Sequence, residues 1–229
     1  MKKSILLVAS LCVVSSVWAE TVREATADRL DHAGAVLRDI MSVPDKGIPE
    51  EVLEHAKCVA VVPNLIKGGF VFGAEGGRGV ATCRTQNGWS APAFFTITGG
   101  SWGLQIGVEG VDLVLIIQND RGMQRLIGSK FEIGADASAA AGPVGRHPSA
   151  DTDWKLTTEI LTYSRSKGAF AGITLTGAAI RRDNNSTDAI YGHEIPTRSI
   201  LQGAIPVPPV AHAFLDAVSD AKVQANAAS

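Results

Sequence analysis

The segment GGFVFGAEGGRGVATCRTQNGW, residues 68–89, decides the fold that this sequence predicts. It contains two β-rich runs, residues 69–73 and 79–84, with glycines inside and between them. The pair Asn87-Gly88 is a strong signal for a tight hairpin turn. Glycines weaken a flat strand, but they suit a sheet that bends sharply or whose backbones approach closely. The segment therefore predicts a strongly curved antiparallel sheet or a barrel-like β core.

Similar β-rich runs continue on both sides of this segment, and none is long. The most apolar is 112–118, which suits a buried strand. The other predicted strands are 58–62, 93–98, 102–109, 131–140, 157–165 and 169–181.

Helical periodicity appears mainly towards the two ends of the chain. In residues 21–41, Leu30, Ala33, Leu37 and Ile40 recur at spacings of three and four, which predicts an amphipathic helix. A second amphipathic helix is expected at 210–225, and shorter helices at 48–56, 123–127 and 183–191. The predicted fold class is therefore α+β, a curved antiparallel or barrel-like β core with flanking N- and C-terminal helices.

The first residues have the layout of a secretory signal. Two lysines precede an apolar run at 5–17, and Val17-Trp18-Ala19 is a plausible cleavage site. We expect a signal peptide at 1–19, a single domain at 20–229, and export to the periplasm or outer envelope. Leu11 stands where a lipoprotein-type signal needs a small residue, which argues against a lipid anchor at Cys12.

Charge composition limits the classes of partner. The whole chain carries a formal net charge of −2, which becomes −4 once Lys2 and Lys3 leave with the signal. We therefore expect no nucleic-acid partner, and any contact with phosphate groups must come from a local basic patch. Cys58 and Cys83 form either one disulfide or two small buried apolar side chains, and the sequence leaves both interpretations open.

Two glycine motifs suggest chemistry, but neither has the expected context. Residues 99–103, GGSWG, match the nucleophile pattern G-x-S-x-G, yet the following residues alternate like a strand, whereas the motif needs a helix there. The run GAEGGRG, 73–79, lacks the Lys-Ser/Thr pair of a phosphate loop, although Arg78 among glycines could meet an anion. The five histidines are scattered and predict no metal site. We expect a non-enzymatic protein without cofactors.

The basic residues of the loops and strand ends are more suggestive. If the loops gather at one end of the sheet, they form a cationic patch; otherwise they are dispersed solubilising charges. These residues are Lys67, Arg146, Arg165, Lys167, Arg181 and Arg182.

An ordered set of motifs gives the most specific signal. The set comprises CVAVVP (58–63), KGGF (67–70), GGRG (76–79), WSAP (89–92), GSWGLQIG (100–107), DLVL (112–115), AGPVGR (141–146), YSRSKGAFAGI (163–173), Asn184 and YG (191–192). Together these motifs closely resemble the SYLF domain, also called the Ysc84 actin-binding-like family, over about residues 28–192.

The resemblance implies binding to membrane lipids through a basic surface and an N-terminal amphipathic helix. Carried onto this sequence, it implies an anionic phospholipid partner at the envelope membrane; the lipid-binding residues expected are Lys67, Arg78, Arg146, Arg165 and Lys167. Some relatives bind actin, but in an exported protein we expect actin to be an unlikely partner. The helix at 21–41 has an alternative role, packing on the sheet as ordinary core. The alternative function is a periplasmic carrier of small apolar ligands, or a scaffold, with a pocket in the curved sheet.

Overall fold

The computed structural model describes residues 2–42, 47–69, 72–102, 107–128, 130–144, 158–166, 169–172 and 177–228. The helices within these ranges are α1 (Lys2–Met41), α2 (Glu50–His55), α3 (Asp120–Ile127), α5 (Asn184–Tyr191), α6 (Thr197–Leu201) and α7 (His212–Ala228), with a 3₁₀ turn at Pro209–Ala211. The strands are β1 (Cys58–Gly69), β2 (Phe72–Thr85), β3 (Gly88–Trp89), β4 (Ala93–Trp102), β5 (Gly107–Ile117), β6 (Lys130–Glu132), β7 (Ala139–Ala141), β8 (Ile160–Ser166), β9 (Ala169–Gly172) and β10 (Ala179–Arg182).

One strongly curled sheet organises the molecule. Its strands lie in the order β6-β10-β4-β2-β1-β5-β8-β7, with β3 paired to β2 and β9 to β8. All pairs between these strands are antiparallel except β7 with β8. The prediction of an α+β fold with a curved sheet and terminal helices is confirmed.

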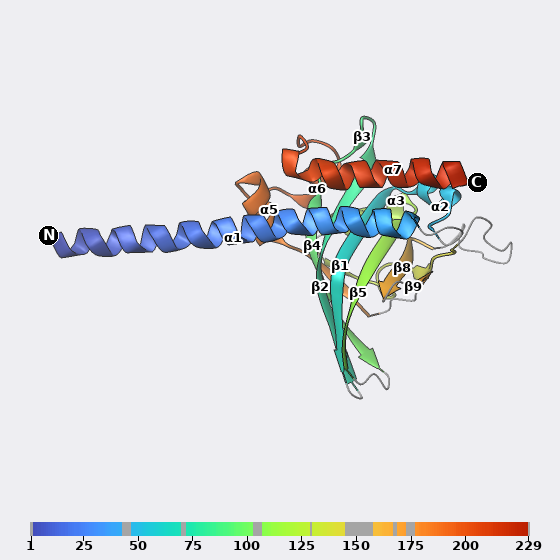
Figure 1. Cartoon of the computed structure of the whole chain (residues 1–229), viewed down its shortest axis with the longest axis horizontal. Coiled ribbons are helices and arrows are strands. Elements are labelled where there is room, and N and C mark those ends of the chain that lie inside the picture. The colour runs from blue at the N-terminus through green and yellow to red at the C-terminus, as the bar shows by residue number, and fades with distance from the viewer. Residues whose placement is uncertain are drawn as a thin grey trace.

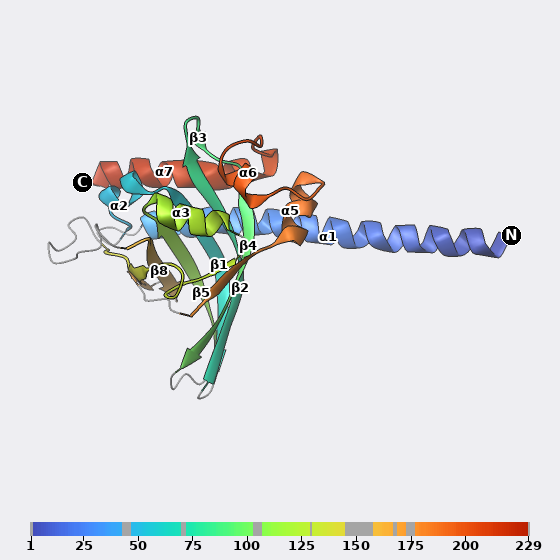
Figure 2. The ribbon, with the colours of Figure 1, turned by 180° about the vertical axis from the view of Figure 1, so that it is seen from behind.

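The two faces of the sheet have separate apolar cores. On one face α7 packs against both α1 and α2, and residues such as Leu37, Val61 and Phe214 form a shared core (Figure 1). On the other face α3 and α6 cover a second core that includes Leu65, Ile97 and Ile200 (Figure 2). We call these the α1 face and the α3 face. Alternation along each strand assigns neighbouring side chains to opposite faces.

Beyond the helical layer, β1, β2 and β5 extend together as a long ribbon (Figures 1 and 2). The glycine-rich sequence makes this close packing feasible. At Gly77 of β2, for example, an added side chain would overlap Val62 of the neighbouring strand β1.

Several predicted boundaries were wrong. The strand predicted at 58–62 is longer, because β1 continues through Pro63-Asn64 by a bulge in which Asn64 adopts φ 51°. The Asn64 N–H donates to Asp112 Oδ1 at 3.0 Å, so a residue of β5 satisfies the irregular backbone. Of the run 69–73, Gly69 ends β1 and residues 72–73 begin β2, which continues through the second run, 79–84. The predicted strand 131–140 contributes to β6 and β7, and 169–181 contributes to β9 and β10. Helix α6 was not predicted, and α1 extends back to Lys2.

Candidate functional site

Helix α1 lies across the sheet because its apolar stripe is buried. Leu30, Ala33, Leu37 and Ile40 are each 0 or 1% exposed and belong to the core of the α1 face. Of the two roles considered for this helix, the structure therefore shows the packing role for residues 30–40. This part of the stripe is not free to enter a membrane interface.

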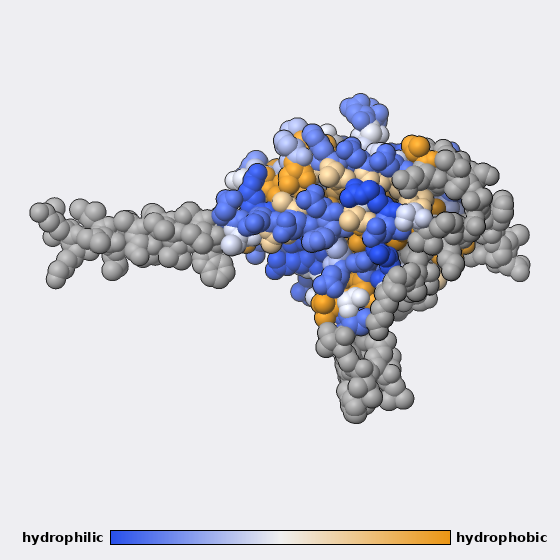
Figure 3. Space-filling view, in the orientation of Figure 1, coloured by the Kyte–Doolittle hydropathy of each residue, from blue (hydrophilic) through white to orange (hydrophobic). Residues whose placement is uncertain are grey.

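A groove of about 570 Å³ separates the polar edge of α1 from the sheet. The helix contributes Asp28, Arg29 and His32, and the sheet contributes Arg78, Asp112 and Arg165, among other residues. Figure 3 shows hydrophilic side chains over α1 and the neighbouring surface. Both signs of charge thus line the groove, and their pairing decides which charges are available to a ligand.

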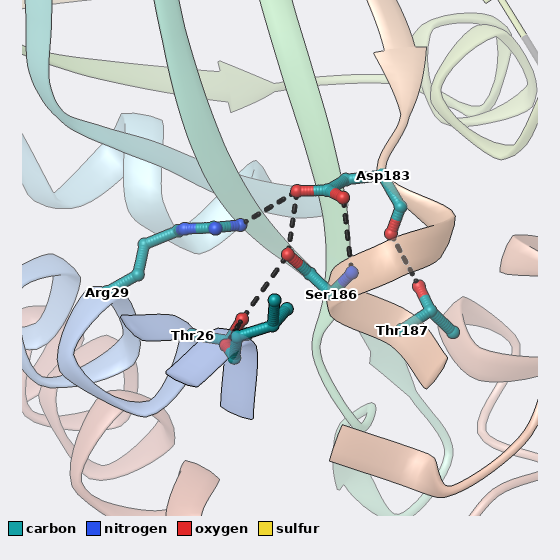
Figure 4. Close-up of polar contacts among 6 residues, drawn as sticks. Thr26, Arg29, Asp183, Ser186 and Thr187 are labelled. Atoms are coloured by element: carbon teal, nitrogen blue, oxygen red, sulfur yellow. Dashed lines mark hydrogen bonds and ion pairs between the residues drawn. The ribbon is translucent and has the colours of Figure 1, made fainter. Parts of the chain in front are cut away.

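Arg29 of this groove also belongs to a buried polar cluster with Asp183 and Ser186 (Figure 4). Arg29 Nη1 donates to Asp183 Oδ2 at 3.2 Å, and both side chains are 8% exposed. The same oxygen accepts from the Ser186 hydroxyl at 2.7 Å, and Asp183 Oδ1 accepts from the Ser186 N–H at 3.1 Å. Asp183 is the N-cap of α5, so one carboxylate both begins that helix and ties it to α1.

Arg29 has a perturbed electrostatic environment. Burial lowers the pKa of its guanidinium, the Asp183 carboxylate opposes this shift, and the like charge of Arg78 adds to the lowering. Arg29 also lies over the Phe94 ring, 5.8 Å from its centroid. A buried cation held by one carboxylate has a structural role, because the pair satisfies charges that would otherwise be costly to bury.

Arg78 differs from Arg29 although the two are near enough for their charges to interact. It is exposed, it lines the groove, and within the described part of the chain it has no hydrogen bond or ion pair. Its guanidinium is therefore available for a ligand with acceptor oxygens, such as a phosphate or carboxylate.

The other predicted lipid-binding residues have different surroundings. Lys67 Nζ lies 3.5 Å from Glu75 Oε2 on the neighbouring strand. Arg165 Nη1 lies 2.6 Å from Asp39 Oδ2 and 3.8 Å from Asp112 Oδ2. Arg146 and Lys167 lie outside the described residues. The structure brings Arg78 and Arg165 to one groove, but only Arg78 among the described three is free of carboxylate partners there.

The remaining motifs also have defined places. Cys58 and Cys83 are opposite each other on β1 and β2 and are joined by a disulfide, the first of the two interpretations that the sequence left open. Ser101 lies within β4, opposite Gly73 of β2, so the helix that a nucleophile elbow needs does not follow it directly. The end predicted for this strand at residue 98 was wrong, because β4 continues to Trp102. In the ranges that the structure describes, no three potential metal ligands come together.

Sequence reasoning missed Arg29 and Asp183. A signal for each is present: Arg29 adjoins the apolar stripe of the first helix, and Asp183 directly precedes a helix, where an acid is a favourable N-cap. Their pairing could not be read from the sequence, because 154 residues separate them.

Comparison with known proteins identifies the family. The family model for Ysc84, described as "Las17-binding protein actin regulator", matches residues 98–221, more than half of the chain. This chain belongs to the Ysc84 family. The predicted resemblance is confirmed.

Curated relatives support the same assignment. "SH3 domain-containing YSC84-like protein 1" of Rattus norvegicus is 34% identical over 183 residues, 77% of this chain and 54% of the relative. "Protein YSC84" of Saccharomyces cerevisiae is 34% identical over 177 residues, 75% of this chain and 37% of the relative. The chain thus spans about half, or less, of the length of the curated relatives it matches. The description of the family model names a binding protein and regulator rather than an enzyme.

Among the residues that the structure describes, none of the helices is both long enough and apolar enough to span a bilayer.

Proposed function

We propose that this chain is a non-enzymatic protein that binds surfaces of anionic phospholipid. The observation that carries the proposal is Arg78: an exposed guanidinium beside the groove, without a carboxylate partner in the described part of the chain. Arginine binds phosphate groups bidentately, and each basic side chain near an anionic membrane contributes about 1 kcal/mol. Arg146 and Lys167 remain predicted contributors, whereas Lys67 and Arg165 would first have to exchange their carboxylate partners for phosphate.

The composition of the groove disfavours the alternative carrier function. A pocket for a small apolar ligand is mostly lined by apolar and aromatic side chains, with few polar groups. The apolar residues that line this groove are Ala25, Ala35, Val36 and Pro63, none of them aromatic, and the other lining residues, such as Asp28, Arg78 and Arg165, are polar or charged. A charged groove in which Arg78 has no carboxylate partner among the described residues is better suited to contact an anionic membrane than to hold an apolar ligand.

We also propose that the protein is exported to the periplasm or outer envelope. The signal-like segment at 1–19 supports export, and the Cys58–Cys83 disulfide is consistent with an oxidising compartment. Fractionation of cells that produce the full chain tests this proposal, since a reduced cytosolic protein would contradict it.

Vesicle co-sedimentation tests the proposed lipid function. The full chain is mixed with vesicles of phosphatidylcholine, with or without phosphatidylglycerol, over a range of salt concentrations. The apolar segment 5–17 would add binding that does not depend on lipid charge, so the readout is the difference between the two vesicles. We expect stronger binding to anionic vesicles that weakens as salt increases, because salt screens exposed charges. Equal binding to both vesicles at low salt would contradict the proposal.

Actin provides the second arm of this experiment. The matching family model is described as an actin regulator, so an actin partner stays open for this chain. The chain is therefore also sedimented with filamentous actin in the absence of lipid. Binding to actin, together with equal binding to both kinds of vesicle, would indicate a protein partner instead of a membrane.

A further inference from the structure

The strand register places Arg78 at one end of a row of side chains that crosses four strands. Arg78 of β2 is opposite Thr96 of β4, Thr96 is opposite Arg181 of β10, and Arg181 is opposite Lys130 of β6. Three of these four residues are basic, although they come from distant parts of the sequence. We call Arg78, Arg181 and Lys130 the basic row.

All members of the basic row lie on the same face of the sheet. On β4, β10 and β6 the neighbours Ile97, Ile180 and Phe131 are buried in the core of the α3 face. Because successive side chains alternate between faces, Thr96, Arg181 and Lys130 belong to the α1 face. Arg78 shares that face, since Val80, two residues further along β2, is buried in its core.

The basic row is open to solvent. All three side chains are exposed, and in the described part of the chain none has a hydrogen bond or ion pair. Glu132, two residues after Lys130, is the acid that shares this face on β6. Arg181 and Lys130 are directly opposite each other, a placement that destabilises an antiparallel pair of like charges. An anion bound from solvent between the two side chains would relieve this repulsion.

We propose that the basic row is the surface with which the protein contacts the phosphate groups of an anionic bilayer. This inference rests on the proposed function and assigns its contact residues. With strands about 4.8 Å apart, the backbones of Arg78 and Lys130 are roughly 15 Å apart, too far for one phosphate to bridge. A line of separated cations instead matches an extended surface on which phosphates of several lipids are available. The row runs from the groove beside α1 to β6 at the end of the strand order.

The test compares two triple variants of the full chain that lose the same charge. The row variant carries Arg78→Gln, Arg181→Gln and Lys130→Gln. The control variant carries Lys57→Gln, Arg125→Gln and Arg198→Gln; its two arginines lie on α3 and α6, which cover the α3 face, and Lys57 pairs with Asp120 of α3. Binding to phosphatidylglycerol-containing vesicles is measured at low salt, and thermal unfolding verifies that both variants fold.

We expect the row variant to lose roughly 100-fold in affinity, about fivefold for each basic residue, and the control variant to lose much less. A single-residue comparison is sharper still. Arg181→Gln should weaken binding about fivefold, whereas Arg182→Gln, next along the same strand on the opposite face, should have little effect.

The outcomes separate this inference from the proposed function. If the unmodified chain prefers anionic vesicles but both triple variants lose affinity equally, only net charge matters and the basic row is overturned. Undiminished binding by the row variant also overturns the row while the lipid function stands. If the unmodified chain shows no preference for anionic vesicles, both proposals fail. If inorganic phosphate, added at constant ionic strength, displaced the protein from the vesicles, the result would indicate a site for a single anion and would overturn the extended contact.

Discussion

Arg29 and Arg78 lie close to each other on the α1 face, yet their surroundings are opposite. Arg29 is 8% exposed and is held by Asp183, whereas Arg78 is exposed and has no carboxylate partner among the described residues. The polar cluster around Arg29 therefore joins α1 to α5, while the basic row that begins at Arg78 has its charges directed to solvent. The comparison shows that a basic residue cannot be assigned to a membrane contact by charge alone, because its partners decide what it can bind.

The largest effect is expected where the closed cluster is broken. Asp183→Asn leaves the buried Arg29 without its counter-charge, so the free energy of unfolding should fall by about 3–5 kcal/mol. Urea unfolding measures the loss, with Asp188→Asn on the exposed side of α5 as the matched control. A loss below about 1 kcal/mol, similar to that of an exposed ion pair, would show that the cluster is not the structural link described here.

A smaller loss is expected from Ser186→Ala. Its hydroxyl donates to Asp183 and is fully buried, so its removal should lower the free energy of unfolding by about 1.5–3 kcal/mol. Ser219→Ala, on α7, removes a hydroxyl that bonds a carbonyl of its own helix and should change stability much less. Equal effects of the two substitutions would argue against a special role for the cluster.

Arg165 lies between the two extremes of the comparison. Its ion pairs with Asp39 and Asp112 are partly exposed, so Arg165→Gln should cost only about 0.2–1 kcal/mol of stability. Because carboxylates already neutralise this arginine, its substitution should weaken vesicle binding less than Arg78→Gln does. If Arg165→Gln weakened vesicle binding more than Arg78→Gln, the membrane contact would instead lie around Arg165.

The smallest expected effect has the opposite sign. Lys130→Gln removes one of two like charges directly opposite each other on β6 and β10, so it should raise the free energy of unfolding by about 0.2–1 kcal/mol. The gain should be largest at low salt and should diminish as salt screens the repulsion. A loss of stability on this substitution would mean that Lys130 has a stabilising role in the fold.

Much of the fold could be predicted because it is encoded locally. The glycine-rich run 68–89 and the Asn87-Gly88 turn predicted a curved antiparallel sheet, and the period of three to four residues in 21–41 predicted an amphipathic helix, with its role left open. The continuation of β1 through Pro63-Asn64 could not be predicted, since the bulge depends on Asp112 from another strand. Local sequence identifies a residue that can end a strand, but not the distant partner that lets the strand continue.

The candidate site was less accessible to sequence reasoning. Arg78 stood out because glycines surround it, but nothing local distinguished the paired Arg165 from the open Arg78. The basic row depends on the register of four strands that are not consecutive in the chain. Lys130 has an ordinary context in the sequence, and only its position opposite Arg181 makes it a candidate contact.

Arg78→Gln in the full chain tests the central claim most directly. It removes one guanidinium from the open row and also relieves the like-charge effect on Arg29. We predict that affinity for phosphatidylglycerol-containing vesicles falls about fivefold while the free energy of unfolding stays equal or rises slightly. Unchanged vesicle affinity, or a loss of affinity that only accompanies a loss of stability, would contradict the account.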